Sequence, residues 1–147
     1  MNIRKMTMAD YDAVFQLWAG TEGLGLRKLD DSSAGVAKFL DRNPHTNFVA
    51  EVDHKIIGIA LSGHDGRRGY LYHMAVMTDY RRQGIGKALL QAICTAMKNE
   101  GINKLALVVF SKNKTGNGFW QSQGWHHRMD LNYCDLSLSD ENVSIEI

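Results

Sequence analysis

The chain has 147 residues, and its 17 Lys and Arg against 16 Asp and Glu give a net charge of +1 at pH 7. A charge this close to zero provides no general attraction for nucleic acid or for an anionic membrane surface, so we expect neither partner. With 44% hydrophobic residues the chain can bury one core, and we expect a single domain over residues 1–147.

No segment predicts export, membrane insertion or metal binding. The N-terminus lacks an apolar run behind positive charge, and no apolar stretch approaches the roughly 20 residues that a membrane helix needs. Cys94 and Cys134 lie far apart and have no metal-ligand neighbours, and the pair His126-His127 has no second ligand cluster at metal spacing. We therefore expect a cytoplasmic protein with reduced thiols and no metal.

Hydrophobic periodicity and turn residues predict a chain that mixes strands and helices. The expected strands are, in chain order, residues 3–6, 48–52, 56–62, 70–77 and 105–110, with one or two closing strands within 125–138. The expected helices follow the capping residues 7–10, begin at Asp31 or Ser32 and end before Pro44, cover about 86–99, and occupy the later part of 113–123.

The most informative segment is Tyr80–Lys87, which reads YRRQGIGK and joins an expected strand to an expected helix. The first amides of a helix have no partner within it and carry partial positive charge, so a tight turn before a helix can bind an anion. Gly84 and Gly86 remove β-carbons that would hold a phosphate away from those amides. The nearby cations are Arg81, Arg82 and Lys87. The segment predicts a pyrophosphate cradle, with an ordinary turn before a surface helix as the alternative.

The glycine spacing excludes the two best-known phosphate loops. A P-loop needs four residues between its glycines followed by Lys-Ser/Thr, and the dinucleotide fingerprint needs a third glycine. The pattern Arg/Gln-x-x-Gly-x-Gly/Ala, present here over 81–86, resembles the acetyl-CoA loop of the GNAT superfamily of N-acetyltransferases. The order of the expected elements is also the GNAT order, so the resemblance covers nearly the whole chain.

This resemblance implies an α/β (α+β) GNAT fold. Its central sheet is mixed and mostly antiparallel, its parallel fourth and fifth strands splay apart, and helices flank it. The implied activity is transfer of an acetyl group from acetyl-CoA, a co-substrate, to a primary amine of a small molecule or peptide, by direct attack in a ternary complex. A homodimer is consistent with the resemblance, because family members often pair through late strands.

The resemblance also assigns residues to the cofactor. Open strand backbone at 74–76 is implied for the pantetheine amides, with an amide near Val76 as donor to the thioester oxygen. Asn113 begins a segment that continues with Trp120 and with Gly124-Trp125 at family spacing. These cofactor segments are also similar to those of ribosomal-protein alanine acetyltransferases. The full expected set is Met74, Ala75, Val76, Arg81, Arg82, Gln83, Gly84, Ile85, Gly86, Lys87, Asn113 and Trp120.

Proton transfer is where this chain departs from the family. Trp120 stands where many relatives carry a tyrosine that protonates the departing thiolate, and an indole N–H cannot deliver a proton at neutral pH. Val108 stands where the ribosomal-protein alanine acetyltransferases keep a glutamate.

The remaining catalytic candidates are tyrosines. Tyr70 and Tyr72 are two apart on a strand and should face the same side, and Tyr133 on a closing strand is a further candidate. Lining of the acceptor pocket is the alternative role for these side chains. His73 should point to the opposite face, as a core histidine.

The missing base bears on the substrate and on the activity itself. Deprotonating a lysine-like amine at pH 7 costs roughly 4–5 kcal/mol, whereas an α-amine costs only about 1 kcal/mol. The sequence therefore favours an α-amine or another amine of low pKa. The alternative function is a sensor or regulatory module that binds acetyl-CoA with weak or no turnover.

Overall fold

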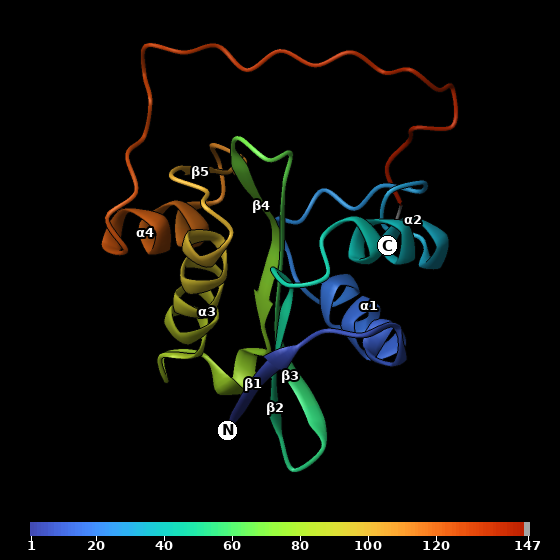
Figure 1. Ribbon diagram of the computed structural model, residues 1–147, viewed down its shortest axis with the longest axis vertical. Helices are drawn as coiled ribbons and strands as arrows, with labels where there is room; N and C mark the ends of the chain where they lie inside the picture. Colours follow the sequence, from blue (N-terminus) through green and yellow to red (C-terminus); the bar gives the residue numbers. More distant parts are fainter. Residues whose placement is uncertain (146–147) are drawn as a thin grey trace.

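The computed structural model describes residues 1–145. In chain order its elements are β1 (Asn2–Lys5), the short 3-10 helix η1 (Met8–Asp10), α1 (Tyr11–Ala19), α2 (Ser33–Arg42), β2 (Phe48–Val52), β3 (Lys55–His64), β4 (Gly69–Val76), the 3-10 helix η2 (Thr78–Tyr80), α3 (Ile85–Asn99), β5 (Leu105–Ala106) and α4 (Lys114–Ser122). One five-stranded sheet, in the order β1-β2-β3-β4-β5, forms the middle layer. Helices α1 and α2 cover one face, and α3 and α4 cover the other (Figure 1).

The sheet is antiparallel except at one edge. Strands β1 to β4 pair antiparallel with their neighbours, while β4 and β5 run parallel and are connected through α3. A parallel pair needs such a crossover because its second strand must start again from the same end. The two strands pair only at Gly69 with Leu105 and at Tyr70 with Ala106. The expected mixed sheet with splayed fourth and fifth strands is therefore confirmed.

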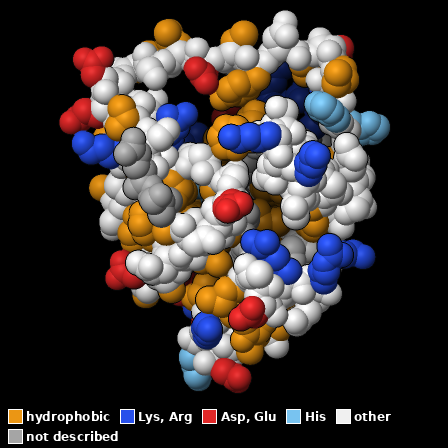
Figure 2. Space-filling view, turned by 180° about the vertical axis from the view of Figure 1, so that it is seen from behind, with side chains coloured by type: hydrophobic (Ala, Val, Ile, Leu, Met, Phe, Trp, Pro, Cys, Tyr) orange, Lys and Arg blue, Asp and Glu red, His pale blue; other side chains and the backbone are white. Residues whose placement is uncertain are grey.

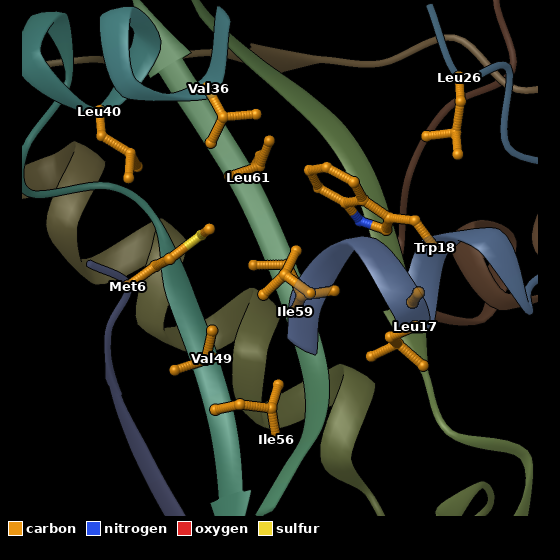
Figure 3. Close-up of a cluster of buried hydrophobic side chains, with 12 residues drawn as sticks. Met6, Leu17, Trp18, Leu26, Val36, Leu40, Val49, Ile56, Ile59 and Leu61 are labelled. Atoms are coloured by element: carbon orange, nitrogen blue, oxygen red, sulfur yellow. The ribbon is translucent and has the colours of Figure 1, made fainter. Parts of the chain in front are cut away.

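Each face of the sheet buries its own apolar cluster. Between the sheet and helices α1 and α2, the fully buried Trp18 packs among side chains that include Val36, Ile59 and Leu61 (Figure 3). On the other face, the apolar stripe of α3 packs against β3 and β4 and includes Leu89, which is 0% exposed. Because the two clusters lie back to back, the central strands β3 and β4 are held on both sides.

Strand β4 carries a bulge at its middle. Ile59 pairs with Ala75 and Leu61 with Tyr72, so the single residue between them on β3 faces two residues, His73 and Met74, on β4. His73 has a φ of +32°, which departs from strand geometry. The extra residue breaks the alternation of side chains between the faces of the sheet.

The bulge places His73 on the same face as Tyr72. The His73 ring packs at 5.2 Å from Trp18, and the Tyr72 ring packs at 5.6 Å from Phe39 of α2. Both neighbours belong to helices on the same face of the sheet (Figure 1). The expectation that His73 points away from Tyr72 is wrong, because strict alternation holds only in a strand without a bulge.

The expected closing strands are also absent. Residues 126–143, here called the arch, leave the end of α4, pass over the β3–β4 hairpin and reach the α2 side, where Ser144 forms a bridge with Arg27 (Figure 1). The arch contains no strand, and β5 ends at Ala106 rather than at Phe110. Alternating apolar residues predict a strand, but a strand forms only where a neighbour pairs with it.

No helix within residues 1–145 is long and apolar enough to cross a membrane.

A charged cluster fixes the N-terminal strand to η1. The Arg4 guanidinium donates to both carboxylate oxygens of Asp10, at 2.9 and 2.8 Å, and to Glu51 at 2.9 Å. Asp10 also accepts the Thr7 backbone N–H at 2.9 Å and is buried. These hydrogen bonds, led by that from Arg4, lower the pKa of Asp10 below its ordinary value of 3.8.

Replacing Asp10 with Ala should lower the free energy of unfolding by about 1–3 kcal/mol at pH 7, through loss of a cap and of charge-assisted hydrogen bonds. The folded-state pKa of Asp10 is below its unfolded value, so its contribution is present above 3.8 and is lost as pH falls through the folded pKa. Urea unfolding of wild type and Asp10→Ala should therefore converge in acid. The control, Asp12→Ala on the exposed side of α1, should show little difference at either pH. Equal gaps at pH 7 and at about pH 2 would contradict the assignment.

Candidate active site

The loop before α3 has the geometry of an anion site. Residues 81–84 are all exposed, and Gly84 is the N-cap of α3 with a φ of +79°. No side chain caps the helix, and a β-carbon added at Gly84 would meet no atom within 4 Å. The first amides of α3 therefore face open space, where a phosphate group fits their unpaired N–H donors and the helix dipole.

The cations of the loop divide into two roles. Arg81 donates from Nε to the carbonyl of Val76 at 3.0 Å, so it holds the loop against the end of β4. Arg82, at a φ of +60°, and Lys87 are exposed, and neither forms an ion pair within residues 1–145. These two side chains remain available to a phosphate.

Gly86 has a packing role that the sequence did not indicate. A β-carbon at this position would lie 3.2 Å from two ring carbons of Phe119 on α4. Its lack of a side chain thus lets the first turn of α3 pack closely against α4. Of the two loop glycines, only Gly84 faces the open space where a phosphate would lie.

Beyond Tyr70 the edge of β4 that faces β5 is unpaired. Met77 N–H donates to the carbonyl of Ile57 at 2.8 Å, so Val76, one residue earlier, turns its N–H and carbonyl away from β3. The Val76 carbonyl accepts a hydrogen bond from Arg81, and the Val76 N–H points to the gap between the splayed strands. Met74, Ala75 and Val76 thus lie along an open backbone edge that ends beside the phosphate loop.

The glycine-rich connection between α1 and α2 lies close to the chain after β5. A β-carbon at Gly23 would be 2.7 Å from Nδ2 of Asn113, and one at Gly25 would be 3.3 Å from the Phe110 ring. The connection, which includes the exposed Glu22, therefore borders the gap between β4 and the segment that follows β5.

Asn113 and Trp120 both have structural partners. The Asn113 side chain accepts the Gly116 N–H at 2.9 Å and caps α4. The Trp120 ring packs at 4.9 Å from Phe119 and 5.2 Å from Trp125, against the cluster around α3. The position of the Trp120 ring is therefore fixed by this aromatic packing.

The three candidate tyrosines lie near the start of β4, at the end of the strand away from the phosphate loop. The rings of Tyr70 and Tyr72 are 5.0 Å apart, which agrees with the expectation that they face the same side. Burial, and then the nearby Tyr133 of the arch, raise the pKa of Tyr70, and Tyr133 also contributes to the raised pKa of Tyr72 after burial and Asp30. A raised pKa keeps a phenol protonated at neutral pH, so these side chains can donate hydrogen bonds but are poor bases.

A histidine–carboxylate pair lies beside these tyrosines and was missed by the sequence analysis. Nε2 of His73 is 2.9 Å from Oδ1 of Asp31, and the two side chains are 16% and 6% exposed. Oδ2 of Asp31 accepts the Arg27 backbone N–H, and Trp18 Nε1 donates to the His73 carbonyl at 3.1 Å. The carboxylate and the indole fix both the ring and the backbone of His73. Residues 42 apart gave no sequence signal for this pair, because only the bulge turns His73 toward Asp31.

Two shallow cavities lie elsewhere. One, of about 500 Å³, lies between α1 and the β2–β3 turn, and the other, of about 570 Å³, lies between Lys5, His45 and α3. None of the expected site residues lines either one. Within residues 1–145, no group of three or more His, Cys, Asp or Glu is placed to hold a metal ion.

Comparison with known proteins assigns the family. The model of the acetyltransferase (GNAT) family matches residues 11–125. The curated protein Acetyltransferase ECA0875 of Pectobacterium atrosepticum is 31% identical over 121 residues, which is 82% of this chain and 84% of that protein. The chain belongs to the GNAT acetyltransferase family.

Solved structures share the fold at lower identity. Ard1 from Thermoplasma volcanium has a TM-score of 0.74 at 18% identity, over 84% of this chain and 80% of that chain. The structure of AAC(6')-Iy, in complex with a bisubstrate analog of CoA, has a TM-score of 0.71 at 20% identity, over 92% of this chain and 97% of that chain. The ribosomal-protein-S18-alanine N-acetyltransferase of Escherichia coli has a TM-score of 0.69 at 23% identity, over 84% and 76%. These likenesses confirm the GNAT fold.

Proposed function

We propose that this GNAT protein transfers an acetyl group from acetyl-CoA to a primary amine, by direct attack of the amine on the thioester in a ternary complex. The observation that supports this most strongly is the uncapped N-terminus of α3 beside the unpaired edge of β4. A diphosphate and an extended pantetheine chain need these two surfaces in this order. The complex of the structural relative AAC(6')-Iy with a CoA bisubstrate analog supports the choice of cofactor.

In this proposal the loop and the strand edge bind different parts of the cofactor. Arg82, Lys87 and the amides that begin α3 bind the pyrophosphate, while backbone groups at 74–76 bind the pantetheine. The Val76 N–H stabilises the negative charge that develops on the thioester oxygen during attack. Holding the thioester beside the amine in this way supplies several kcal/mol of the barrier as orientation. The other expected cofactor residues, which hold the shape of the loop and the gap, are Arg81, Gln83, Gly84, Ile85, Gly86, Asn113 and Trp120.

We assign the proton acceptor to His73, through one water molecule, with Asp31 as the residue that orients its ring. A neutral imidazole keeps one ring nitrogen able to accept a proton, and a hydrogen-bonded carboxylate fixes its orientation as in other histidine bases. The phenols of Tyr70, Tyr72 and Tyr133 then line the acceptor site, where their oxygens accept hydrogen bonds from the amine N–H groups and leave the nitrogen lone pair free for attack.

The proposed acceptor is an α-amine or another amine of low pKa, because such an amine costs less to deprotonate at neutral pH than a lysine-like amine. Among the structural relatives, one is an alanine N-acetyltransferase of a ribosomal protein and others are aminoglycoside acetyltransferases. The alternative is a module that binds acetyl-CoA without turnover, which the replacement of the family's tyrosine by Trp120 favours. We place either form in the cytoplasm, consistent with the free thiols of Cys94 and Cys134.

Replacing Gly84 with Ala should weaken acetyl-CoA binding at least about tenfold, because the loop must change its left-handed φ and the amides shift. The matched control is Gly101→Ala at the other end of α3. Gly101 has a φ of +76° against +79° for Gly84, and neither β-carbon would meet an atom within 4 Å. Both variants should lose about 1 kcal/mol of stability, but only Gly84→Ala should lose affinity in calorimetric titration. Equal affinities for the two variants would refute the pyrophosphate cradle.

Turnover should be highest with amines of low pKa. Thiol release from acetyl-CoA should be measured with N-terminal peptide α-amines, aminoglycosides, lysine side chains in N-terminally blocked peptides, and polyamines. At pH 7 the free-amine fraction of an α-amine exceeds that of a lysine side chain by roughly 2–3 powers of ten. Activity confined to lysine peptides or polyamines would contradict the proposed acceptor. Tight acetyl-CoA binding without turnover on any amine would favour the sensor.

Replacing His73 with Gln should lower kcat by roughly 10²-fold, with little change in the affinity for acetyl-CoA. The loss should lie in kcat rather than in KM for the amine, because the proton acceptor is removed while the binding surfaces remain. Tyr72→Phe, the control on the same face, should raise KM for the amine and leave kcat nearly unchanged. An unaltered kcat in His73→Gln would remove His73 from the proton route.

A further inference from the structure

A cavity of about 570 Å³ lies between the edge strand β1 and helix α3, on the face of the sheet opposite to α1 and α2. Phe48 of β2 lines its apolar side together with Ala92 and Ala96, which are about one turn apart on α3. Since these alanine side chains are short, the helix leaves room beside the ring. Cavities of roughly 300–1,000 Å³ with a mostly apolar lining are typical of sites that bind small molecules.

Polar side chains of α3 form a second row along the same cavity. Gln91, Thr95 and Asn99 are spaced four residues apart, so they lie one above the other on one side of the helix. All three are exposed, and they provide amide and hydroxyl groups beside the apolar row. A ligand with both an apolar part and polar groups therefore suits this lining better than a purely apolar one.

Lys5 of β1 supplies a positive charge at the cavity. Its Nζ is 3.0 Å from Nδ1 of His45, which also lines the cavity. An ammonium group can only donate, so Nδ1 accepts and carries no proton, and the His45 ring adds no charge. One of the three ammonium N–H groups is used in this way, and Lys5 forms no ion pair within residues 1–145. The remaining N–H groups suit a carboxylate of a ligand.

Glu100, at the C-cap of α3, supplies a negative charge to the same cavity. Its Oε1 is 3.2 Å from Nε2 of His64, whose Nδ1 lies 2.9 Å from the backbone nitrogen of Gly66. A backbone N–H can only donate, so a neutral His64 ring carries its proton on Nε2 and donates it to Glu100. The C-terminal end of a helix is itself negative, which makes this an unfavourable place for a carboxylate. With its side chain 31% exposed, Glu100 can reach a positively charged ligand group.

The cavity is separate from the candidate active site and from the arch. Among the described residues, none from the loop before α3, from β4 or from 126–143 lines it. The arch bears exposed apolar side chains, such as Leu136 and Leu138, and stands away from the body with an opening beneath it (Figure 2). A molecule bound between β1 and α3 would therefore touch neither the proposed acceptor site nor the arch.

We propose that the cavity between β1 and α3 binds a free α-amino acid, whose carboxylate pairs with Lys5, whose ammonium pairs with Glu100 and whose side chain packs on Phe48. The lining offers one positive and one negative charge, so a ligand that carries both charges satisfies the two together. A ligand with a single charge would leave the opposite side chain without a partner. The proposal goes beyond acetyl transfer and does not depend on it, because the cavity and the candidate active site have no residue in common.

The first test is binding in the absence of acetyl-CoA. Each common amino acid is titrated singly into the full chain and followed by nuclear magnetic resonance, and at least one with an apolar side chain should bind with a Kd below about 1 mM. Two derivatives of that amino acid then test the charges, since its N-acetyl form lacks the ammonium and its amide lacks the carboxylate. Each derivative should bind at least about tenfold more weakly, because one of the two ion pairs is lost.

The second test assigns each charge to its residue. Lys5→Met should bind the amino acid at least about tenfold more weakly than wild type and should no longer distinguish it from the amide. Glu100→Gln should no longer distinguish the amino acid from the N-acetyl form. The matched control, Lys98→Met, removes an exposed cation of α3 that does not line the cavity, and it should bind as wild type does. Circular dichroism checks the folding of each variant, and the comparison of derivatives on the unaltered protein stands without them.

An α-amine could also enter the proposed acceptor site, and His73→Gln separates the two sites because it leaves the cavity intact. Loss of amino-acid binding in His73→Gln would overturn the proposal. So would a Kd above about 1 mM for every amino acid, or equal losses in Lys98→Met and Lys5→Met. All titrations omit acetyl-CoA, so failure of the acetyl-transfer assay leaves them unaffected, and failure of amino-acid binding leaves the proposed acetyl transfer unaffected.

Discussion

The bulge in β4 is the constraint on which the candidate site depends. An extra residue at His73 interrupts the regular alternation of β4, and the interruption is held by the Trp18 indole on the His73 carbonyl and by Asp31 on its ring. Trp18 is itself fully buried, so the hydrophobic core of α1 fixes the bent backbone. Because the bulge reverses the alternation, His73 and Tyr72 share a face, and imidazole and phenols stand together where the acceptor is proposed to bind.

The second half of the site depends on the pairing between β4 and β5, which ends after two residues. Two residues of β4 pair with β5, and the rest of the strand keeps its outward backbone groups unpaired. In the middle of a sheet such groups would be costly, but here they face a gap bordered by the glycine-rich connection and by Asn113. A cofactor with amide groups along its length can satisfy them. The unpaired edge and the uncapped helix thus follow from one structural choice, the separation of two parallel strands.

Local patterns in the sequence predicted most of the elements and the cofactor loop. The glycine turn before α3 and the strands β1 to β4 depend on neighbours a few residues away, and the structure places them within two residues of the expected bounds. Two of the expected cofactor segments, the loop before α3 and the end of β4, meet where Arg81 donates to the Val76 carbonyl. Local patterns cannot predict contacts between residues that are far apart in the sequence. The Asp31–His73 contact and the close approach of Gly86 to Phe119 exist only after folding.

The expected closing strands show the same limit, here as elements that were predicted and do not form. The alternation in 128–138 is real in the sequence, and the prediction of strands there was physically sound, but an isolated chain provides no neighbour for them. The sequence specifies the preference of a segment for extended backbone and not the molecule on which its hydrogen-bonding partner lies. For the same reason β5 was predicted four residues longer than it is, since its outer residues also lack a neighbour.

An arch that is attached at both ends limits what its exposed apolar side chains can reach. A free tail bearing the same apolar side chains could reach the open sheet edge of a neighbouring molecule and pair with it. A segment fixed at Trp125 and again at Ser144 cannot move far from the rest of its own chain. Cutting the second attachment, by proteolysis or truncation after residue 138, would free exposed apolar side chains of the arch and make the protein prone to aggregation.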